Sequence, residues 1–361
     1  EYAITRPDTP APWMNYLGNG QFSSVISNNA GGLIFDRDPG SFRITRYNFS
    51  NVAQDRPGRY LYFKDEKTGA VWSPTWQPVQ KKLDFYESRH GMGYTEICAE
   101  YEGVKSEITY YIPKGAHYEL WSARVKNTTD KDISLKVFSY IEFSSYIAKY
   151  DIECDWPRYF FNCEPYENAI VFDPSDDFID EKRRLAYIST DLDIDSYDCS
   201  RDAFLGRYRD ESNPIAVENG HCSNSKINAD NACGSFCCNL KLKAGEEKEF
   251  VFSVGNAESL EEIKAQSAAA ADKNLRENQL NALKEFWLDN SSRLVANTPD
   301  EAMNTMLNIW HPYQCRMTFN WSRFISYYER GLDRGWGFRD SMQDVLGIMH
   351  IVPEEAKQRI K

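Results

Sequence analysis

The sequence predicts a large β-sandwich domain, followed by linker helices and the start of an all-helical domain. Up to about residue 255, short runs alternate apolar and polar residues and are rich in aromatic and β-branched residues, which is typical of strands. After residue 256 the apolar spacing changes to the period of a helix. With 361 residues, the chain is also long for a single core. We therefore expect a sandwich at 1–255, a helical linker at 256–297 and a helical domain that begins at 298–361.

The predicted strands are recognised by their alternation and by the turn residues that end them. Residues 60–63 precede a turn at 65–69, and residues 106–112 precede the breakers Pro113 and Gly115. Residues 119–127 and 133–140 are separated by a short polar segment, as in neighbouring antiparallel strands. Many strands without long helices between them predict two sheets packed face to face, because each sheet must cover its apolar face.

The helical part begins with a segment rich in helix formers. Residues 259–294 contain no proline and predict one long helix or two short ones. A capping box follows, in which the Thr298 hydroxyl caps the next helix and Glu301 reaches back to the cap amide. That helix carries an apolar stripe expected to face a core. Its members are Met303, Met306, Leu307, Trp310 and Tyr313. The residues after the cap make only two or three helices, so we expect this chain to hold only the start of the helical domain.

Composition excludes several classes of partner. The 42 basic residues face 54 acidic ones, and a net charge of -12 repels phosphate backbones, so nucleic acid is not expected as a partner. No apolar run approaches the roughly 18 residues of a membrane span, and we expect no membrane partner. The first residues show no secretory signal, and the nine cysteines lack the spacing of a disulfide framework. We therefore expect a cytoplasmic protein.

Two patterns could suggest a metal site. Four cysteines gather near His221 without the paired C-x-x-C spacing of a zinc site, and we expect buried free thiols. They are Cys222, Cys233, Cys237 and Cys238. The aspartates of 191–195 alternate like the start of a calcium-binding loop, but Ser196 stands where that loop needs glycine. A solvated strand face explains them, and we expect neither a metal nor a cofactor.

Residues 321–344 are the most informative segment. Four arginines and four acidic residues surround Gly331, Gly335 and Gly337. A helix that runs into such a loop can bring guanidinium and carboxylate groups together beside aromatic rings. Sugars present C–H faces to aromatic rings, and phosphate accepts the planar fork of arginine well. These residue types therefore favour a site for sugar and phosphate; the alternative is a set of structural ion pairs around a loop.

Short sequence blocks occur in a fixed order along nearly the whole chain. They lie at residues 15–18, 30–32, 43–47, 58–62, 72–76 and 89–94, and then at 308–310, 313–315, 318–320, 334–341 and 343–350. In order and spacing they resemble glycoside hydrolase family 94, and within it the cellobiose phosphorylases. The resemblance implies an N-terminal β-sandwich, linker helices and an (α/α)6 barrel, of which this chain would hold only the beginning.

The resemblance also implies roles for individual residues. Arg323 corresponds to an arginine that helps to bind phosphate, and Arg334 and Asp340 correspond to residues that hold the non-reducing sugar. Arg339 lies within the motif and is expected to shape the loop through ion pairs. Arg158 could correspond to an acceptor-side arginine that reaches across a homodimer interface, with a surface ion pair as the alternative.

Members of the family are inverting disaccharide phosphorylases, so the resemblance implies phosphorolysis. Inverting chemistry needs an acid at the glycosidic oxygen and a nucleophile on the opposite face of the sugar. Phosphate is already anionic, so it needs charge compensation, as from Arg323, instead of a protein base. The family's general acid is the aspartate of a Trp-Asn-Asp motif, which this sequence does not contain. The resemblance implies that this aspartate lies downstream of Lys361. We therefore expect no catalytic residue in this chain, and no activity from it alone.

The expected substrate pair is cellobiose and phosphate, giving α-glucose 1-phosphate and glucose, because residues 337–340 read as in the glucose-specific members. Residues 195–198 and 204–214 are more similar to the N,N'-diacetylchitobiose phosphorylases, which are the nearest alternative, ahead of the laminaribiose and cellobionate enzymes. Outside this reaction, the alternatives are a non-catalytic carbohydrate-binding sandwich and a glycoside hydrolase that uses water. The resemblance also suggests a homodimer, with no cofactor beyond inorganic phosphate as co-substrate.

Overall fold

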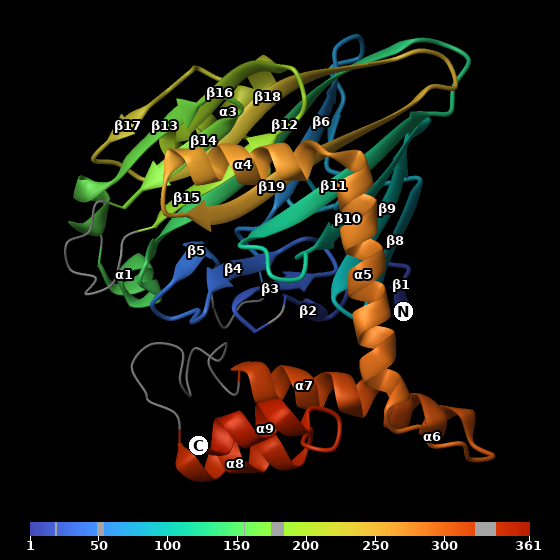
Figure 1. Ribbon diagram of the computed structural model, residues 1–361. Helices are drawn as coiled ribbons and strands as arrows, with labels where there is room; N and C mark the ends of the chain where they lie inside the picture. The colour runs from blue at the N-terminus through green and yellow to red at the C-terminus, as the bar shows by residue number, and fades with distance from the viewer. Residues whose placement is uncertain (19, 49–53, 155, 175–183, 322–336) are drawn as a thin grey trace.

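The computed structural model describes residues 1–18, 20–48, 54–154, 156–174, 184–321 and 337–361. In these residues two antiparallel sheets pack face to face, and a group of helices lies below one side of the sandwich (Figure 1). The predicted fold class, a β-sandwich followed by helices, is confirmed.

The first sheet has ten strands in the described part of the chain. In spatial order they are β1 (Tyr2–Ile4), β8 (Phe85–Gly91), β9 (Tyr94–Tyr101), β10 (Val104–Tyr111), β11 (Tyr118–Asn127), β19 (Glu247–Ala257), β15 (Leu185–Thr190), β14 (Ala169–Asp173), β13 (Asn162–Tyr166) and β17 (Ile227–Asn228). The run from β8 to β11 is a meander of sequential hairpins, as the short polar turns predict.

The second sheet has nine strands among the described residues. Seven follow one path: β16 (Ile194–Ser200), β18 (Ala232–Leu242), β12 (Ile133–Tyr146), β5 (Arg43–Thr45), β4 (Gly32–Asp36), β3 (Phe22–Ser27) and β2 (Met14–Gly18). Beside that path, β6 (Tyr60–Asp65) pairs with β12 and with β7 (Val71–Trp72). Strands β2 to β5 form the part of this sheet that lies nearest the last helices of the chain, drawn in red (Figure 1).

Aromatic and branched side chains from both sheets fill the space between them. Phe143 of β12 stacks on Phe172 of β14, with ring centroids 5.0 Å apart. Along β6 the alternation predicts opposite faces, and Phe63 does belong to the inner core, whereas Tyr62 packs in a separate outer cluster. Two short helices, α2 (Arg201–Leu205) and α3 (Ile215–Asn219), contribute to that outer cluster.

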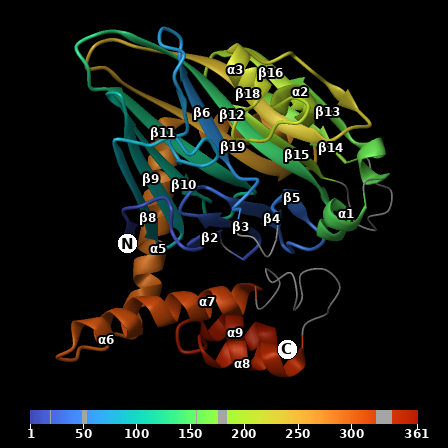
Figure 2. The same ribbon diagram turned by 180° about the vertical axis from the view of Figure 1, so that it is seen from behind.

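Two helices follow the sandwich, at the segment for which the sequence predicted either one long helix or two short ones. Helix α4 (Leu260–Ala271) begins after Ser259, whose hydroxyl accepts a hydrogen bond from Glu262 N. Helix α5 (Lys273–Ser292) begins after Asp272, whose carboxylate accepts one from Leu275 N. The break therefore lies at a second cap residue within the helix-rich segment. Helix α4 lies along the sandwich, and α5 runs from it to the remaining helices (Figures 1 and 2).

The sequence analysis predicted the wrong N-cap residue, Thr298, for the next helix. The N-cap of α6 (Glu301–Thr305) is Asp300, whose carboxylate accepts hydrogen bonds from Ala302 N at 2.9 Å and Met303 N at 3.2 Å. Thr298 instead accepts a hydrogen bond from Asp300 N through its hydroxyl oxygen. Aspartate caps as well as threonine does, and here it stands directly before the helix.

The prediction that an apolar stripe on this helix faces a core is wrong for four of its five residues. Its first four members remain exposed on α6 and on the π-helical turn Met306–Trp310, whereas Tyr313 is buried. The exposed members are Met303, Met306, Leu307 and Trp310. Of these four, Trp310 does meet another element, because its ring packs edge to face on that of Tyr2 in β1 at 5.8 Å between centroids.

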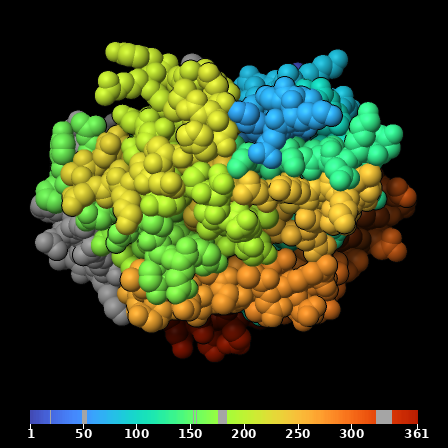
Figure 3. All heavy atoms as spheres, turned by 90° about the horizontal axis from the view of Figure 1, so that it is seen from above, coloured from blue at the N-terminus to red at the C-terminus, as the bar shows by residue number. Residues whose placement is uncertain are grey.

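The last three helices pack on one another. They are α7 (His311–Trp321), α8 (Phe338–Leu346) and α9 (Pro353–Ile360), and they share one apolar cluster that includes Phe319, Val345 and Ala356. Two further short helices, α1 (Ala148–Glu153) and the 3₁₀ turn Trp156–Phe160, lie in the sandwich half. Seen from above, the helices that directly follow the sandwich form a broad orange band along one side, and only a small red portion of the last helices emerges at the rim (Figure 3).

Candidate active site

Helices α7 and α8 form an antiparallel pair. A Cβ atom on Gly347, just after α8, would lie 3.0 Å from the Cys315 Sγ atom near the start of α7. Phe319, further along α7, packs with Val345 of α8. The end of α7 and the beginning of α8 therefore lie at the same end of the pair (Figure 1). The residues that the sequence singles out for sugar and phosphate follow α7 and begin α8.

Asp340 lies in the first turn of α8. Its side chain folds back toward the helix start, because a Cβ atom on Gly337 would lie 2.6 Å from Asp340 Oδ2. A carboxylate at a helix N-terminus is stabilised by the unpaired amides and by the helix dipole. Asp340 is half-buried. This placement fits a carboxylate that accepts hydrogen bonds from sugar hydroxyl groups.

The structure describes only some of the other residues that the sequence analysis singled out in this segment. Arg323 and Arg334 lie outside the described residues, so their meeting with Asp340 stays a prediction. Arg339 is exposed on α8. Phe338, the first residue of α8, is 81% exposed and presents an aromatic ring next to the motif.

The Trp-Asn-Asp motif that carries the family's general acid does not occur in this sequence. Lys361 follows the last residue of α9 and is the last residue of this sequence. The resemblance expects the catalytic aspartate downstream of Lys361, and that expectation stays a prediction.

Helix α7 is fastened to the sandwich by two aromatic residues. The Tyr313 hydroxyl lies 2.7 Å from the carbonyl oxygen of Tyr16 and 3.0 Å from Asn15 Oδ1, and it accepts a hydrogen bond from Gly93 N at 3.3 Å. Burial raises the pKa of Tyr313, which keeps this hydroxyl protonated. Near the other end of α7, the ring of Trp321 lies 5.3 Å from that of Tyr16. Sequence reasoning counted Tyr313 as a core residue and missed its hydrogen bonds.

A buried carboxylate lies close to this contact. Asp36 follows Phe35, whose ring meets that of Trp321 edge to face at 6.0 Å, and Asp36 is fully buried. Asn256 donates a hydrogen bond to Asp36 Oδ2 at 3.0 Å, and Arg184 Nη1 lies 3.5 Å from the same oxygen. These two partners lie far from Asp36 and from each other in the sequence, so no local motif indicated them. They fix the end of β4 beside the helix pair.

Arg158 lies in the sandwich half, on the 3₁₀ turn after α1. Its guanidinium carbon lies 5.1 Å from the centre of the Tyr159 ring, and its Nη2 atom donates to the Tyr159 hydroxyl at 3.3 Å. Tyr159 is itself exposed. Arg158 and Asp340 therefore belong to different halves of the molecule, and a role for Arg158 at the site stays a prediction.

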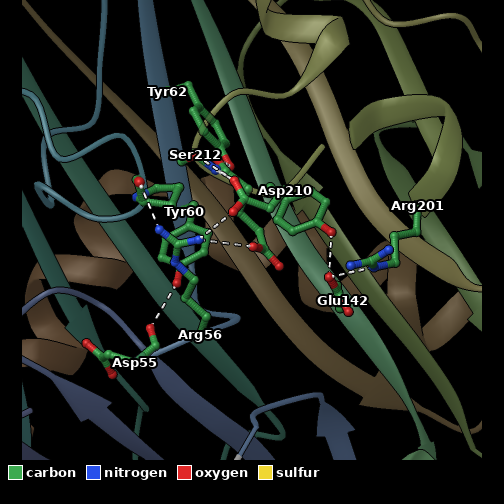
Figure 4. A network of polar contacts seen from close by, with 11 residues as sticks. Asp55, Arg56, Tyr60, Tyr62, Glu142, Arg201, Asp210 and Ser212 are labelled. Carbon is green, nitrogen blue, oxygen red and sulfur yellow. Dashed lines mark hydrogen bonds and ion pairs between the residues drawn. The ribbon is translucent and has the colours of Figure 1, made fainter. Parts of the chain in front are cut away.

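A polar network lies on the outer side of β6 and β12 (Figure 4). Arg56 pairs with Asp210 at 3.1 Å, and Arg201 Nε donates to Glu142 at 2.9 Å. The carbonyl of Glu211 accepts the Tyr62 hydroxyl, while burial and the neighbouring Glu142 raise the pKa of the Glu211 carboxyl group. Because its charges are paired within the sandwich, this network fastens residues 206–214 to the sheet.

The residues of the two sequence patterns that could suggest a metal site make ordinary protein contacts. All nine cysteines lie in the described part of the chain, and each is a free thiol. Asp191 accepts a hydrogen bond from Val251 N, and Asp195 pairs with Lys136. No cluster of three or more potential metal ligands occurs among the described residues. Within the same residues, no helix has both the length and the apolar character to cross a membrane.

Fold and sequence together define a protein with a large β-sandwich that two helices, α4 and α5, join to a further group of helices. Residues 1–273 match the supersandwich domain of glycosyl hydrolase 94, and residues 286–361 match the catalytic domain of the glycosyl hydrolase 94 superfamily. The chain therefore belongs to glycosyl hydrolase family 94.

Curated relatives of the chain include several phosphorylases and a cyclic beta-(1,2)-glucan synthase of Rhizobium meliloti, which is 28% identical over 98% of this chain and 12% of that protein. The chain is 39% identical over 370 residues to an N,N'-diacetylchitobiose phosphorylase of Vibrio furnissii, a match that covers 100% of this chain and 45% of the relative. It is 30% identical to a 3-O-beta-D-glucopyranosyl-beta-D-glucuronide phosphorylase of Paenibacillus borealis, over 99% of this chain and 44% of that protein. The chain thus spans less than half the length of these relatives.

Among solved structures, a bacterial glucoamylase complexed with acarbose superposes with a TM-score of 0.50. The match covers 88% of this chain and 42% of the glucoamylase, at 10% sequence identity. Identity this low indicates a shared fold only. It agrees with a sandwich followed by helices.

Proposed function

We propose that the full-length protein is an inverting disaccharide phosphorylase, which cleaves a β-linked disaccharide with inorganic phosphate. The observation that carries this proposal is the match of residues 1–273 and 286–361, in order, to the two domains of glycosyl hydrolase 94. The phosphorylases of Vibrio furnissii and Paenibacillus borealis support it. The position of Asp340 at the start of α8 is consistent with it.

In this proposal each residue has a separate task. Asp340 accepts hydrogen bonds from hydroxyl groups of the non-reducing sugar, with Arg334 as its partner in holding that sugar. Arg323 offsets the charge of phosphate as the anion approaches the anomeric carbon. This compensation matters because the chain carries a net charge of -12, which repels anions at long range. The general acid would come from the part of the full-length protein beyond Lys361, so we expect the 361-residue chain alone to be inactive.

The disaccharide is proposed from sequence similarity. The 39% identity to N,N'-diacetylchitobiose phosphorylases of two Vibrio species favours N,N'-diacetylchitobiose, together with the similarity at residues 195–198 and 204–214. The cellobiose specificity expected from the sequence is not confirmed by these relatives. Cellobiose remains the second candidate because of Phe338, where the N,N'-diacetylchitobiose enzymes tend to carry tyrosine. Phe338 is exposed in the same first helical turn as Asp340, and its ring could discriminate between donor sugars.

Mass spectrometry of the sugar phosphate separates these candidates. Full-length protein is incubated with phosphate and with N,N'-diacetylchitobiose, cellobiose, laminaribiose or cellobionate in turn. We expect N-acetylglucosamine 1-phosphate from the first, and none when phosphate is omitted. If glucose 1-phosphate forms from cellobiose and phosphate, and the other disaccharides give no sugar phosphate, cellobiose replaces N,N'-diacetylchitobiose as the proposed substrate. Cleavage that needs no phosphate and survives Arg323→Ala would identify a hydrolase instead.

The remaining expectations concern the whole protein. We propose a cytoplasmic homodimer that uses phosphate as co-substrate and needs no metal or redox cofactor. Arg158 would reach the acceptor sugar across the dimer interface. Light scattering of the full-length protein tests the dimer, and kinetics of Arg158→Ala with varied acceptor sugar in the reverse reaction test the role of Arg158.

A further inference from the structure

A cavity of about 640 Å³ lies where the sandwich, α5 and the beginning of α7 meet, and we call it the junction cavity. Its walls come from β1, from β2 and the residues just before it, from the hairpin of β8 and β9, from α5 and from residues 305–314. The N-terminal strand and α5 lie side by side in both ribbon views (Figures 1 and 2). Every residue that lines the cavity belongs to the described part of the chain. Small-molecule sites commonly have volumes of about 300–1,000 Å³, so this cavity has the size of a ligand site.

Three aromatic rings are partly exposed where the junction cavity meets solvent. Tyr2 is 44% exposed, Trp13 40% and Trp310 36%. The Tyr2 ring is adjacent to both tryptophans, with its centroid 5.8 Å from each, and its plane is inclined by 52° to that of Trp13 and by 73° to that of Trp310. The three rings therefore form a curved wall instead of a flat one. Exposed apolar groups that gather around a hollow commonly mark a binding site.

The buried part of the junction cavity is also aromatic. Tyr94, Trp287 and Tyr313 line it, and they are 9%, 3% and 6% exposed. The amide and imidazole groups beside them already have partners. Asn15 Nδ2 donates to two main-chain oxygen atoms, at 2.9 Å and 2.8 Å, and each ring nitrogen of His90 lies 2.9 Å from an oxygen atom with which it can hydrogen-bond. A ligand in this part would therefore meet ring surfaces more than polar groups.

Polar side chains stand around the exposed part of the cavity. Lys284 of α5, Thr305 of α6 and Gln314 of α7 line it, and none of the three is buried. The Lys284 ammonium group lies 4.7 Å from the centre of the Tyr94 ring. The exposed rings add an indole N–H group on each tryptophan and a hydroxyl group on Tyr2. The cavity therefore offers apolar faces in its depth and hydrogen-bonding groups around its opening.

A sugar matches this arrangement better than a hydrocarbon or an anion does. A pyranose ring presents C–H faces to aromatic rings, while its hydroxyl groups bond to polar groups at the edge. A hydrocarbon would cover the polar groups around the opening without bonding to them, which costs free energy. An anion would meet the field of a chain with a net charge of -12. Equatorial hydroxyl groups leave the C–H faces of the sugar ring free, which favours the gluco configuration.

We propose that the junction cavity binds a short chain of pyranose units in the gluco configuration, built of glucose or of N-acetylglucosamine. The rings of Trp13 and Trp310 stack on its sugar faces, and Lys284 and Gln314 bond to its hydroxyl groups. This inference does not rest on the proposed phosphorolysis. It adds a sugar-binding site between the sandwich and the start of α7, apart from Asp340.

The junction cavity and Asp340 lie at opposite ends of α7. Gln314, near the start of α7, lines the cavity, whereas Trp321 ends the helix about 10 Å further along its axis. Asp340 lies at the Trp321 end, because α7 and α8 are antiparallel and Asp340 is in the first turn of α8. A sugar in the cavity would therefore not compete with a sugar held by Asp340.

Trp13→Ala and Trp310→Ala each remove one exposed ring from the junction cavity. Both variants are expected to fold, because these rings are partly exposed and the main-chain bonds of Trp13 remain, among them the one from Asn28 N at 2.9 Å. Trp13→Phe keeps an aromatic ring at the first position. Phe85→Ala is the matched control, because Phe85 is 46% exposed at the other end of β8 and does not line the cavity.

Isothermal titration calorimetry of the full-length protein, without phosphate, tests the proposal with two probes, N,N',N''-triacetylchitotriose and cellotriose. We expect the wild type to bind at least one of them, and Trp13→Ala and Trp310→Ala to weaken binding at one site per chain on the order of tenfold. Trp13→Phe should keep the affinity within about threefold, and Phe85→Ala should not change it. The probe that binds identifies the sugar unit. Absence of binding by the wild type, or equal affinities in the wild type, Trp13→Ala and Trp310→Ala, would overturn the proposal.

The variant Asp340→Ala separates this site from the proposed reaction. We expect it to abolish the formation of sugar phosphate and to keep the binding that Trp13→Ala loses, whereas Trp13→Ala should keep the rate of phosphorolysis within about twofold. If the wild type forms no sugar phosphate but this Trp13-dependent binding is found, the proposed function fails and the junction cavity remains a sugar site. Trisaccharide binding that Asp340→Ala removes and Trp13→Ala leaves intact would contradict the proposal, whatever the reaction.

Discussion

The guanidinium of Arg59 and the carboxylate of Glu119 form an ion pair inside the sandwich, with 2.5 Å between Nε and Oε1. Their side chains are 1% and 0% exposed. The other guanidinium nitrogens of Arg59 donate to the carbonyls of Val25, Gly31 and Leu33 in the second sheet, while Glu119 belongs to β11 of the first sheet. One charged pair therefore joins the two sheets.

Removing one member of this pair should be costly. Arg59→Met leaves the Glu119 carboxylate buried without its cation, and we expect a loss of about 3–5 kcal/mol in the free energy of unfolding. The double variant Arg59→Met with Glu119→Leu should lose less, because no charge remains buried. Urea titration measures both. Asp8→Ala, which breaks the exposed pair with Arg6, is the control and should leave the midpoint unchanged.

Gly337 gives room to the Asp340 carboxylate. A Cβ atom at this position would lie 2.6 Å from Asp340 Oδ2, so Gly337→Ala should push that oxygen away. The backbone angle φ of Gly337 is -69°, which alanine adopts freely, so the helix should persist. We expect KM for the disaccharide to rise on the order of tenfold in the full-length protein. Leu346→Ala, at an exposed position of the same helix, should not change it, and equal effects of the two variants would refute the role of Asp340.

Asp55 should make stability fall as the pH rises. Burial raises the pKa of its carboxyl group to about 6, although hydrogen bonds from Ser27 and Tyr47 oppose the rise. The unfolded value is about 3.9, so between these pH values the folded chain binds more protons than the unfolded chain. Ionisation of Asp55 therefore costs stability, by about 2–3 kcal/mol above pH 6. Urea titrations between pH 4 and 7 should show this slope in the wild type and a weaker one in Asp55→Asn.

His90 should act in the opposite direction. Burial lowers the pKa of its imidazole to about 4, while the Trp13 carbonyl opposes the shift. The neutral ring fits its neighbours, because Nε2 lies 2.9 Å from Trp13 O and Nδ1 lies 2.9 Å from the Thr95 hydroxyl. The unfolded chain binds the proton more readily, so stability should fall as the pH decreases from about 6.5 to 4. His90→Gln should lose this acid sensitivity in urea titrations, and an unchanged slope would show that His90 is not responsible.

Local patterns predicted the architecture because its signals are local. Each signal depends on residues that are close together in the sequence: the alternation at residues 60–63, the turn before β12 and the helical composition after residue 259. The cap at Asp300 was missed because threonine and aspartate compete for the same role within three positions. The exposed stripe on α6 was misjudged because periodicity identifies an apolar face but not the element that covers it.

The candidate site residues come from family motifs alone, and their roles stay predictions. The motif identified Asp340 from the residues around it, and its place at a helix start follows from the glycines before it. The bond between Asn15 and Tyr313 joins residues 298 positions apart, and nothing in either local sequence indicates the other. The same holds for Asp36 and Asn256, separated by 220 positions. Contacts of this kind depend on how the sheets and helices pack, which periodicity does not encode.

Proton NMR of a running reaction tests the central claim most directly. Full-length protein is mixed with N,N'-diacetylchitobiose and inorganic phosphate, and the anomeric signals are followed with time. The account predicts loss of the β-linked disaccharide together with an α-glycosyl 1-phosphate as the first product, and no change in a phosphate-free sample. Release of free sugars at the same rate without phosphate, or a β-glycosyl phosphate as the first product, would contradict it.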